Sequence, residues 1–200
     1  MARIPVLGSA LLAAALTLAG CASMRGNEGW QTLIDGSKGM ENWTNLGGAN
    51  WHAEDGAIMA DHRPDTQPTH YLLTKNSYKD FQLHIEFWVS EDANSGIYMR
   101  CSSVRPMTDR TCYEANIFDR RPDPSFGTGA IVHLAKVDPM PKAAGKWSTY
   151  DITAKGNKMT VVLNGVKTAE AEDGRLPEGP IGLQYAGGVV KFRKFQVRPL

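Results

Sequence analysis

The sequence predicts an all-β protein, built as a sandwich or a barrel of antiparallel strands. Short segments of alternating hydrophobicity are separated by turn signals about every ten residues. The chain contains 20 Gly and 11 Pro, and no convincing amphipathic helix follows the N-terminal segment. Short strands between such turns are typical of sandwiches and barrels.

The first 20 residues are expected to be a secretory signal rather than part of the fold. Arg3 supplies a positive charge, residues 4–18 are mostly apolar, and residues 18–21 read Leu-Ala-Gly-Cys. Such a run is too short to span a membrane comfortably. Small residues directly before a Cys resemble a bacterial lipoprotein cleavage signal, so Cys21 is the expected lipidation site. The alternative is ordinary secretion, with Cys21 incidental.

A lipid anchor would place the protein in the bacterial cell envelope. Ala22 rather than Asp follows the Cys, so we expect attachment to the outer membrane, facing the periplasm. The expected organisation is a signal peptide at 1–20, a lipidated tether at 21–28 and one domain at 29–200, which is long enough for a core. A formal net charge of +1 argues against a nucleic-acid partner. Membrane contact is expected through the lipid anchor only.

The clearest strand is expected at residues 81–89, where Phe81, Leu83 and further apolar side chains alternate with polar ones. Hairpin turns are expected at Asp55-Gly56 and at Asn164-Gly165. In the last strand the apolar phase slips between Phe192 and Phe195, which predicts a bulge. Further strands are expected at 29–36, 50–53, 57–60, 97–100, 113–119, 129–135, 146–152, 158–163, 181–185 and 189–197.

The two strands at 97–100 and 113–119 carry the most informative polar residues. Side chains alternate between the faces of a strand. Tyr98 and Arg100 are therefore expected on one face, as are Glu114 and Asn116. Such a polar face needs water or a polar ligand. A solvated face with one Arg–Glu pair, which stabilises little, is the alternative to a functional site.

Two further cysteines lie at the ends of the segment between these strands. In an oxidising compartment a Cys101–Cys112 disulfide is plausible. It would close a short loop and stabilise the fold by ~2–3 kcal/mol on the chain-entropy model. Strict alternation places the two cysteines on opposite faces, so the bridge requires a bulge or an irregular segment around residues 105–110.

Several catalytic motifs are absent from the sequence. It contains no Gly-rich phosphate loop, no Gly-x-Ser-x-Gly elbow and no His-Glu-x-x-His, and none of its five histidines has metal-ligand spacing to another. Glu114 and Asp119 are a possible carboxylate pair of the kind used in glycoside cleavage. Of the five tryptophans, Trp88 and Trp147 have polar neighbours that favour sugar stacking, whereas core packing is expected for the others.

An ordered set of motifs resembles the 3-keto-disaccharide hydrolase domain family, formerly a domain of unknown function, over residues 29–200. The motifs occur in the order of the family. They are Gly29-Trp30, Leu33-Ile34-Asp35-Gly36, Glu54-Asp55-Gly56, Tyr78-Lys79-Asp80-Phe81, Asn94-Ser95-Gly96-Ile97 with Arg100, Tyr113-Glu114 with Asp119, Gly129-Ala130, Gly145-Lys146-Trp147, Asn164-Gly165, Gly182-Leu183-Gln184 and Phe192-Arg193.

The resemblance implies a concanavalin A-like jelly-roll sandwich of two antiparallel sheets. It also implies cleavage of glycosides that are already oxidised to a ketone at C3. That ketone acidifies the C2 proton, so a base can remove it, the C1 substituent leaves by elimination, and water then adds. On this sequence Glu114 and Arg100 are the expected catalytic residues. The expected substrate contacts are Asn94, Tyr98, Asp119, Trp147 and Gln184.

The chain also departs from the family pattern. Ile34 stands at a usual Phe, Lys146-Trp147-Ser148 at a usual Glu-Trp-Asn, and Arg193-Lys194 at a usual Arg-Asn. His133 occupies a position where an aromatic residue is common in the family. It is either a new ligand-binding residue or a substitution without a functional role.

Two points of function stay open at this level. No cofactor is certain, although a divalent metal on the oxygens of Glu114, Asp119 and Asn94 is possible. The alternatives to an enzyme are a non-catalytic carbohydrate-binding module on the same fold and a structural lipoprotein that binds envelope glycan.

Overall fold

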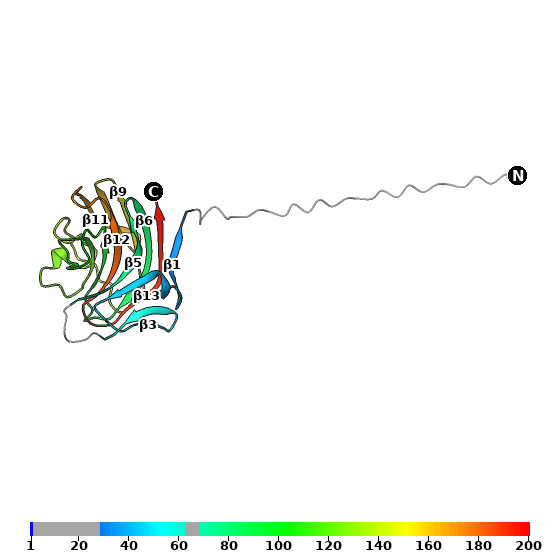
Figure 1. Ribbon diagram of the computed structural model, residues 1–200, viewed down its shortest axis with the longest axis horizontal. Helices are drawn as coiled ribbons and strands as arrows, with labels where there is room; N and C mark the ends of the chain where they lie inside the picture. Colours follow the sequence, from blue (N-terminus) through cyan, green and yellow to red (C-terminus); the bar gives the residue numbers. More distant parts are fainter. Residues whose placement is uncertain (2–28, 63–68) are drawn as a thin grey trace.

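The computed structural model describes Met1 and residues 29–62 and 69–200, which form two packed antiparallel sheets (Figure 1). The predicted all-β sandwich is confirmed. The expected signal peptide and Cys21 lie outside the described residues. Within the part of the chain that the structure describes, no helix has the length and apolar character needed to cross a membrane. The named helices there are two short 3₁₀ turns, η1 (Met40–Asn42) and η2 (Pro124–Phe126).

Sheet A has the strand order β11-β10-β9-β6-β13-β4-β3, and β1 also pairs with β13. Its strands are β1 (Gln31–Asp35), β3 (Trp51–Glu54), β4 (Ala57–Ala60), β6 (Phe81–Val89), β9 (Ser148–Lys155), β10 (Lys158–Leu163), β11 (Val166–Glu172) and β13 (Val190–Pro199).

Sheet B has the strand order β2-β5-β12-β7-β8. Its strands are β2 (Trp43–Leu46), β5 (His70–Tyr78), β7 (Ser95–Met99), β8 (Tyr113–Ile117) and β12 (Gly179–Tyr185). The chain therefore crosses from sheet A to sheet B between β6 and β7, and the two strands with the most informative polar residues lie side by side at one edge of sheet B.

The core lies between the sheets and follows the predicted alternation on β6. Phe81, Leu83, Ile85, Phe87 and Val89 are each at most 3% exposed. Burial of one such side chain contributes about 1.5–3 kcal/mol, so this strand is a main source of stability. Its polar face, with His84, Glu86 and Trp88, lies on the outer side of sheet A and does not share a surface with β7 and β8.

Two predicted hairpin turns and the predicted bulge are present. Asp55 and Gly56 have φ values of 49° and 72°, and Asn164 and Gly165 have 50° and 80°. Positive φ at both central residues is the geometry of a type I′ hairpin turn, which Asx-Gly sequences favour. The register of β13 against β6 shifts between Phe192 and Lys194.

Some expected strand boundaries were wrong. The segment 129–135 makes isolated bridges to Ala115 and within itself instead of a strand, because it bends tightly around His133, which has a φ of 65°. The strands β2, β5 and β11 were not predicted. In β5 the consecutive residues Tyr71, Leu72 and Leu73 are all buried, so the sequence shows no alternation of polar and apolar residues there.

Candidate functional site

A row of polar side chains crosses the outer face of sheet B, which is the face turned away from sheet A. The row, here called the polar row, consists of Tyr71 on β5, Gln184 on β12, Tyr98 on β7 and Glu114 on β8. Strand register places Tyr71 opposite Gln184 and Tyr98 opposite Glu114. Their neighbours in sequence, such as Ile97 and Ala115, belong to the main core. Alternation therefore aims the polar row outward, as it predicted for Tyr98 and Glu114.

Glu114, at the β8 end of this row, is its most informative residue because it is a nearly buried carboxyl group. It is 4% exposed, and burial raises its pKa to about 8. The charge of Asp109 raises the pKa further, while the Tyr98 hydroxyl and the more distant Arg121 act in the opposite direction. A carboxyl group with a pKa near neutrality can both accept and return a proton.

The other side chains of the polar row are joined by one hydrogen bond and one ring contact. Gln184 donates from Nε2 to the Tyr98 hydroxyl at 3.0 Å. The rings of Tyr98 and Tyr71 meet edge to face, with 5.1 Å between their centroids. Burial, together with the Glu114 charge, raises the pKa of Tyr98 far above its usual range, so Tyr98 remains a neutral hydroxyl. Gln184 Oε1 is buried and has no hydrogen-bond partner among the described residues. A buried acceptor without a partner is costly, and a ligand hydroxyl would satisfy it.

A loop of residues 100–112, here called the covering loop, packs on the polar row. A disulfide joins Cys101 to Cys112 at its base. Tyr71 donates a hydrogen bond from its hydroxyl to the carbonyl of Met107 at 3.3 Å. Met107 packs where Gly182 leaves space, since a Cβ at Gly182 would lie 2.4 Å from the Met107 methyl group. The covering loop thus forms a roof over the Tyr71 end of the row.

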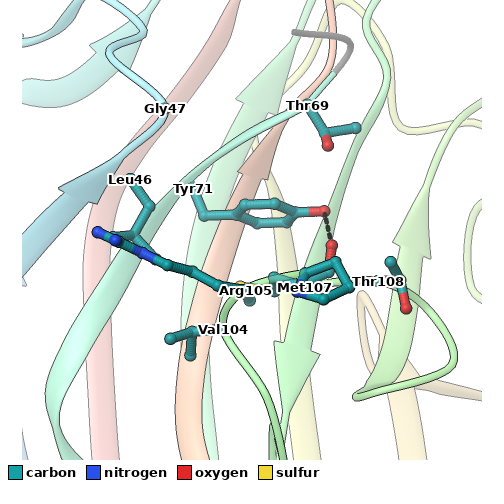
Figure 2. A pocket seen from close by; sticks show the side chains of 9 residues that line it. Leu46, Gly47, Thr69, Tyr71, Val104, Arg105, Met107 and Thr108 are labelled. Atoms are coloured by element: carbon teal, nitrogen blue, oxygen red, sulfur yellow. Dashed lines mark hydrogen bonds between the residues drawn. The ribbon is translucent and has the colours of Figure 1, made fainter.

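Beside this roof lies an open cavity of about 540 Å³. Figure 2 shows the Tyr71 ring at its centre, Thr69 above it, and the Arg105 side chain extending toward Leu46. Val104, Pro106, Met107 and Thr108 of the covering loop close the other side. A cavity of this volume can hold a small ligand such as a sugar. It reaches the polar row through Tyr71.

Arg100 does not lie with Glu114, which corrects the predicted shared face. β7 ends at Met99, and Arg100 has a φ of 50°, so the strand alternation stops there. Its fully buried guanidinium donates to the carbonyls of Lys79 and Gly156, both at 2.7 Å, and to Asp80 Oδ1 at 3.0 Å. Arg100 therefore ties the β5–β6 turn to the β9–β10 turn. The same change of direction turns Cys101 toward Cys112 on the outer face.

Asn94 and Asp119 lie at the ends of the site strands rather than in the polar row. The Asp119 carboxylate accepts hydrogen bonds from Thr128 Oγ1 at 2.6 Å and from the amides of Ala143 and Ala144 at 3.0 Å. It anchors loops beyond β8. Asn94 precedes β7 and bonds through its backbone to residues 186 and 187.

The positions of Glu114, Asp119 and Asn94 test whether these three residues could bind one divalent metal ion. The described residues contain no group of three His, Cys, Asp or Glu side chains placed to hold a metal ion. The Asp119 oxygens are already used by backbone amides and a hydroxyl. The three residues therefore do not fit a shared metal ion.

Trp147 belongs to the other sheet. It precedes β9 and is 36% exposed, with the Arg193 guanidinium 4.3 Å from its ring centroid. Arg193 in turn pairs with Glu86 of β6. Trp147 and Glu114 lie on different sheets, so Trp147 cannot stack on a sugar that is bound at Glu114. A site on sheet B is instead supplied with aromatic surface by Tyr71 and Tyr98.

Sequence reasoning missed Tyr71, Met107 and Asp109. Tyr71 lies on a strand that was not predicted. Met107 and Asp109 lie in the covering loop, whose path no periodicity specifies. The two cysteines were the usable signal, because a bridge between them holds the intervening loop against the strands that it connects.

The β-sandwich fold of the chain is shared with solved structures of other proteins. Among solved structures, the chain is similar to two candidate glycosyl hydrolases from Parabacteroides distasonis. One has 17% identity, a TM-score of 0.72 and coverage of 86% of this chain and 94% of that one. The other has 24% identity, a TM-score of 0.68 and coverage of 86% and 99%. A carbohydrate-binding module, CBM66 from Bacillus subtilis, has 16% identity, a TM-score of 0.59 and coverage of 85% and 95%.

The model of the 3-keto-alpha-glucoside-1,2-lyase-like domain family matches residues 29–198, and the chain belongs to this family. None of the curated proteins matches the chain. Membership in the family connects the chain with carbohydrates and agrees with the resemblance of its motifs.

Proposed function

We propose that the protein cleaves the glycosidic bond of 3-keto-glycosides, including 3-keto-disaccharides, with Glu114 as the base. The observation that carries this proposal is a carboxyl group, 4% exposed and with a pKa of about 8, beside Tyr98 and Gln184 on the outer face of sheet B. Family membership supports a carbohydrate substrate, and the name of the family favours the 3-keto form. A base is most effective when its pKa lies near the working pH, which burial achieves for Glu114.

The reaction follows from the ketone at C3. Glu114 takes the C2 proton, and the electrons of the C2–H bond form an enolate with the C3 carbonyl. The enolate then returns its electrons: the C3 ketone re-forms, a double bond forms between C1 and C2, and the C1–O bond breaks. The departing oxygen takes up a proton. Water then adds across the double bond, with its hydroxyl on C1 and a hydrogen on C2. The net result is hydrolysis.

The other members of the polar row would hold the sugar. The buried Gln184 Oε1 lacks a partner among the described residues and would accept a hydrogen bond from a sugar hydroxyl. Tyr98, a neutral hydroxyl, would stay beside the Glu114 carboxyl as its charge changes. The cavity along Tyr71 and Arg105 lies toward the other end of the row and would receive part of the bound substrate.

A second candidate function is carbohydrate binding without catalysis. The similarity to the module CBM66 favours it, since that fold neighbour is named as a carbohydrate-binding module. In that function the polar row would bind an unoxidised sugar, and Glu114 would stay protonated as a hydrogen-bond donor.

We also propose that the protein is an outer-membrane lipoprotein facing the periplasm. The support is the Leu-Ala-Gly-Cys sequence at residues 18–21 followed by Ala22. Metabolic labelling with a fatty acid, in the parent chain and in Cys21→Ala, tests the lipidation. Loss of label in the variant is expected, and equal labelling contradicts the proposal.

Incubation of the purified chain with a 3-keto-disaccharide and with the unoxidised disaccharide tests the enzymatic function. Products are followed by mass spectrometry, with and without a chelator. Cleavage of the keto form alone is expected, and it should be lost in Glu114→Gln. Saturable sugar binding without cleavage in both the parent and the variant would favour the binding module. Loss of cleavage with chelator would show that a metal is needed.

A further inference from the structure

A second acid–base pair stands at the edge of the site. His133 Nε2 lies 2.8 Å from Asp109 Oδ2, and the two side chains are 32% and 34% exposed. Asp109 belongs to the covering loop, and His133 belongs to the bend that follows β8. The pair is therefore partly open to solvent and joins two loops that are far apart in sequence.

Backbone contacts place this pair beside Glu114. The amide of Val132 donates to the carbonyl of Glu114 at 3.0 Å. Because His133 is the next residue after Val132, its backbone lies close to that of Glu114. Asp109 is close enough for its charge to influence the Glu114 carboxyl. Glu114 is nearly buried, whereas the His133 and Asp109 side chains are each about one-third exposed.

The imidazole is held in a defined orientation. His133 has a φ of 65°, a left-handed conformation that L-residues rarely adopt. Hydrogen bonds between Ile131 and Ala135, 2.9 and 3.0 Å long, close the bend around it. Asp109 engages Nε2, which leaves Nδ1 as the ring nitrogen turned away from the carboxylate. An imidazole whose one nitrogen is held by a carboxylate is the arrangement that lets the other nitrogen exchange protons.

The proposed reaction requires a proton donor besides Glu114. At the moment the C1–O bond breaks, Glu114 holds the proton that it took from C2, and the leaving oxygen needs a proton from elsewhere. The polar row offers Tyr98 and Gln184, but a phenol with a strongly raised pKa is a poor acid, and an amide is not an acid. A donor at the open edge is also better placed for a group that departs toward solvent.

We propose that His133, oriented by Asp109, is the general acid that protonates the leaving-group oxygen. The inference rests on the proposed function. The imidazolium gives its Nδ1 proton to the oxygen as that oxygen takes the electron pair of the C1–O bond, and it becomes a neutral imidazole. It is reprotonated when water is deprotonated for addition at C1. His133 is the catalytic residue in this step, and Asp109 is its positioning residue.

The dependence of the rate on the leaving group tests this proposal. A methoxide leaving group needs protonation as the bond breaks, whereas p-nitrophenolate does not. The purified chain and His133→Asn are assayed with methyl 3-keto-glucoside and with p-nitrophenyl 3-keto-glucoside. Asn is chosen because it tolerates positive φ. We expect His133→Asn to lose about 10²–10⁴-fold in kcat/KM on the methyl substrate and little on the p-nitrophenyl substrate.

Three variants serve as controls. Asp109→Asn should show the same selective loss to a smaller extent, because the imidazole stays but is no longer oriented. His84→Asn should lose nothing on either substrate, since His84 forms a similar pair, 2.7 Å from Asp151, on the outer face of sheet A. Glu114→Gln should lose activity on both substrates. Circular dichroism verifies that each variant is folded.

The outcomes separate this proposal from the function on which it rests. A parent chain that cleaves neither substrate overturns both. A parent chain that is active, with equal losses for the two substrates in His133→Asn or with no loss, overturns only the role of His133. An unfolded His133→Asn leaves the decision to Asp109→Asn, where a loss equal on both substrates overturns the role in the same way.

Discussion

Glu114 and Gly96 are matched to each other across the β7–β8 pair, because the carboxyl group occupies the space that a side chain at Gly96 would fill. A Cβ at Gly96 would lie 2.6 Å from Glu114 Oε1. Gly96 is opposite Asn116 in the register, two pairs along from Tyr98 and Glu114 and therefore on the same face. The glycine thus allows the Glu114 side chain to lie back along the sheet, close to Tyr98 and Gln184.

Gly96→Ala should move the Glu114 carboxyl and lower activity. A misplacement of about 1 Å in a catalytic group can cost roughly 10²-fold in rate. We expect a fall of that order in kcat/KM for a 3-keto-glycoside with the fold retained, measured together with circular dichroism. Gly174→Ala is the matched control, because its Cβ would meet only Asn157 Cβ, at 3.8 Å. Equal activity of the two variants would contradict the role of Gly96.

The raised pKa of Glu114 predicts a pH-dependent stability. The folded state binds the proton more tightly than the unfolded chain, whose carboxyl has a pKa near 4.5, so the folded pKa of about 8 favours folding at low pH. This contribution is complete below pH 4.5 and is lost as the pH rises through 8. Each pKa unit corresponds to about 1.4 kcal/mol, so the loss amounts to several kcal/mol.

Urea unfolding at pH 5 and at pH 9 measures this effect. The parent chain should be less stable at pH 9, and Glu114→Gln, which has no proton to lose, should show a much smaller difference between the two pH values. Parallel behaviour of the parent and the variant would mean that Glu114 is not titrating in the folded state.

Arg100 is predicted to act on stability rather than on catalysis. Its guanidinium bonds two carbonyls and Asp80 from a fully buried position. Loss of one partner of a buried charged network costs about 3–5 kcal/mol. Arg100→Met should therefore unfold at lower urea concentration, with an unchanged kcat under conditions in which it is folded. The exposed Arg105→Met serves as the stability control. A specific loss of kcat in a stable Arg100→Met would restore Arg100 to the reaction.

The disulfide is predicted to support both stability and the site. Cys101→Ser with Cys112→Ser releases a short loop, which costs roughly 3 kcal/mol on the chain-entropy model. It also frees the covering loop that positions Met107 and Asp109. We expect a lower midpoint of unfolding and a reduced kcat/KM. Unchanged kinetics in the variant would show that the loop keeps its position without the bridge.

The sequence was sufficient where one local pattern decides the structure. Alternation on β6 and the Asx-Gly turns predicted strands, their buried faces and two hairpins, because these depend on neighbouring residues alone. The motif order identified the family. Alternation also placed Tyr98 and Glu114 on the outer face, since both lie well inside their strands.

The sequence was insufficient where a single backbone conformation or a distant partner decides. The positive φ of Arg100 ends the alternation of β7. Arg100 and Cys101 therefore do not lie on the faces that a continuous strand would predict for them. Asp119 and Trp147 are in sequence motifs of the family, but their partners come from other elements, namely the amides of residues 143 and 144 and the side chain of Arg193.

By itself, then, the sequence determined an all-β sandwich, its main strands and turns, its family and the outward face that carries Glu114. Only the tertiary structure decided which residues meet on that face. It brought Tyr71, Gln184, Tyr98 and Glu114 together from four strands and placed Asp109 and His133 beside them. The physical reason is that strand pairing and loop packing depend on contacts between residues far apart in the chain, whereas alternation and turn chemistry are local.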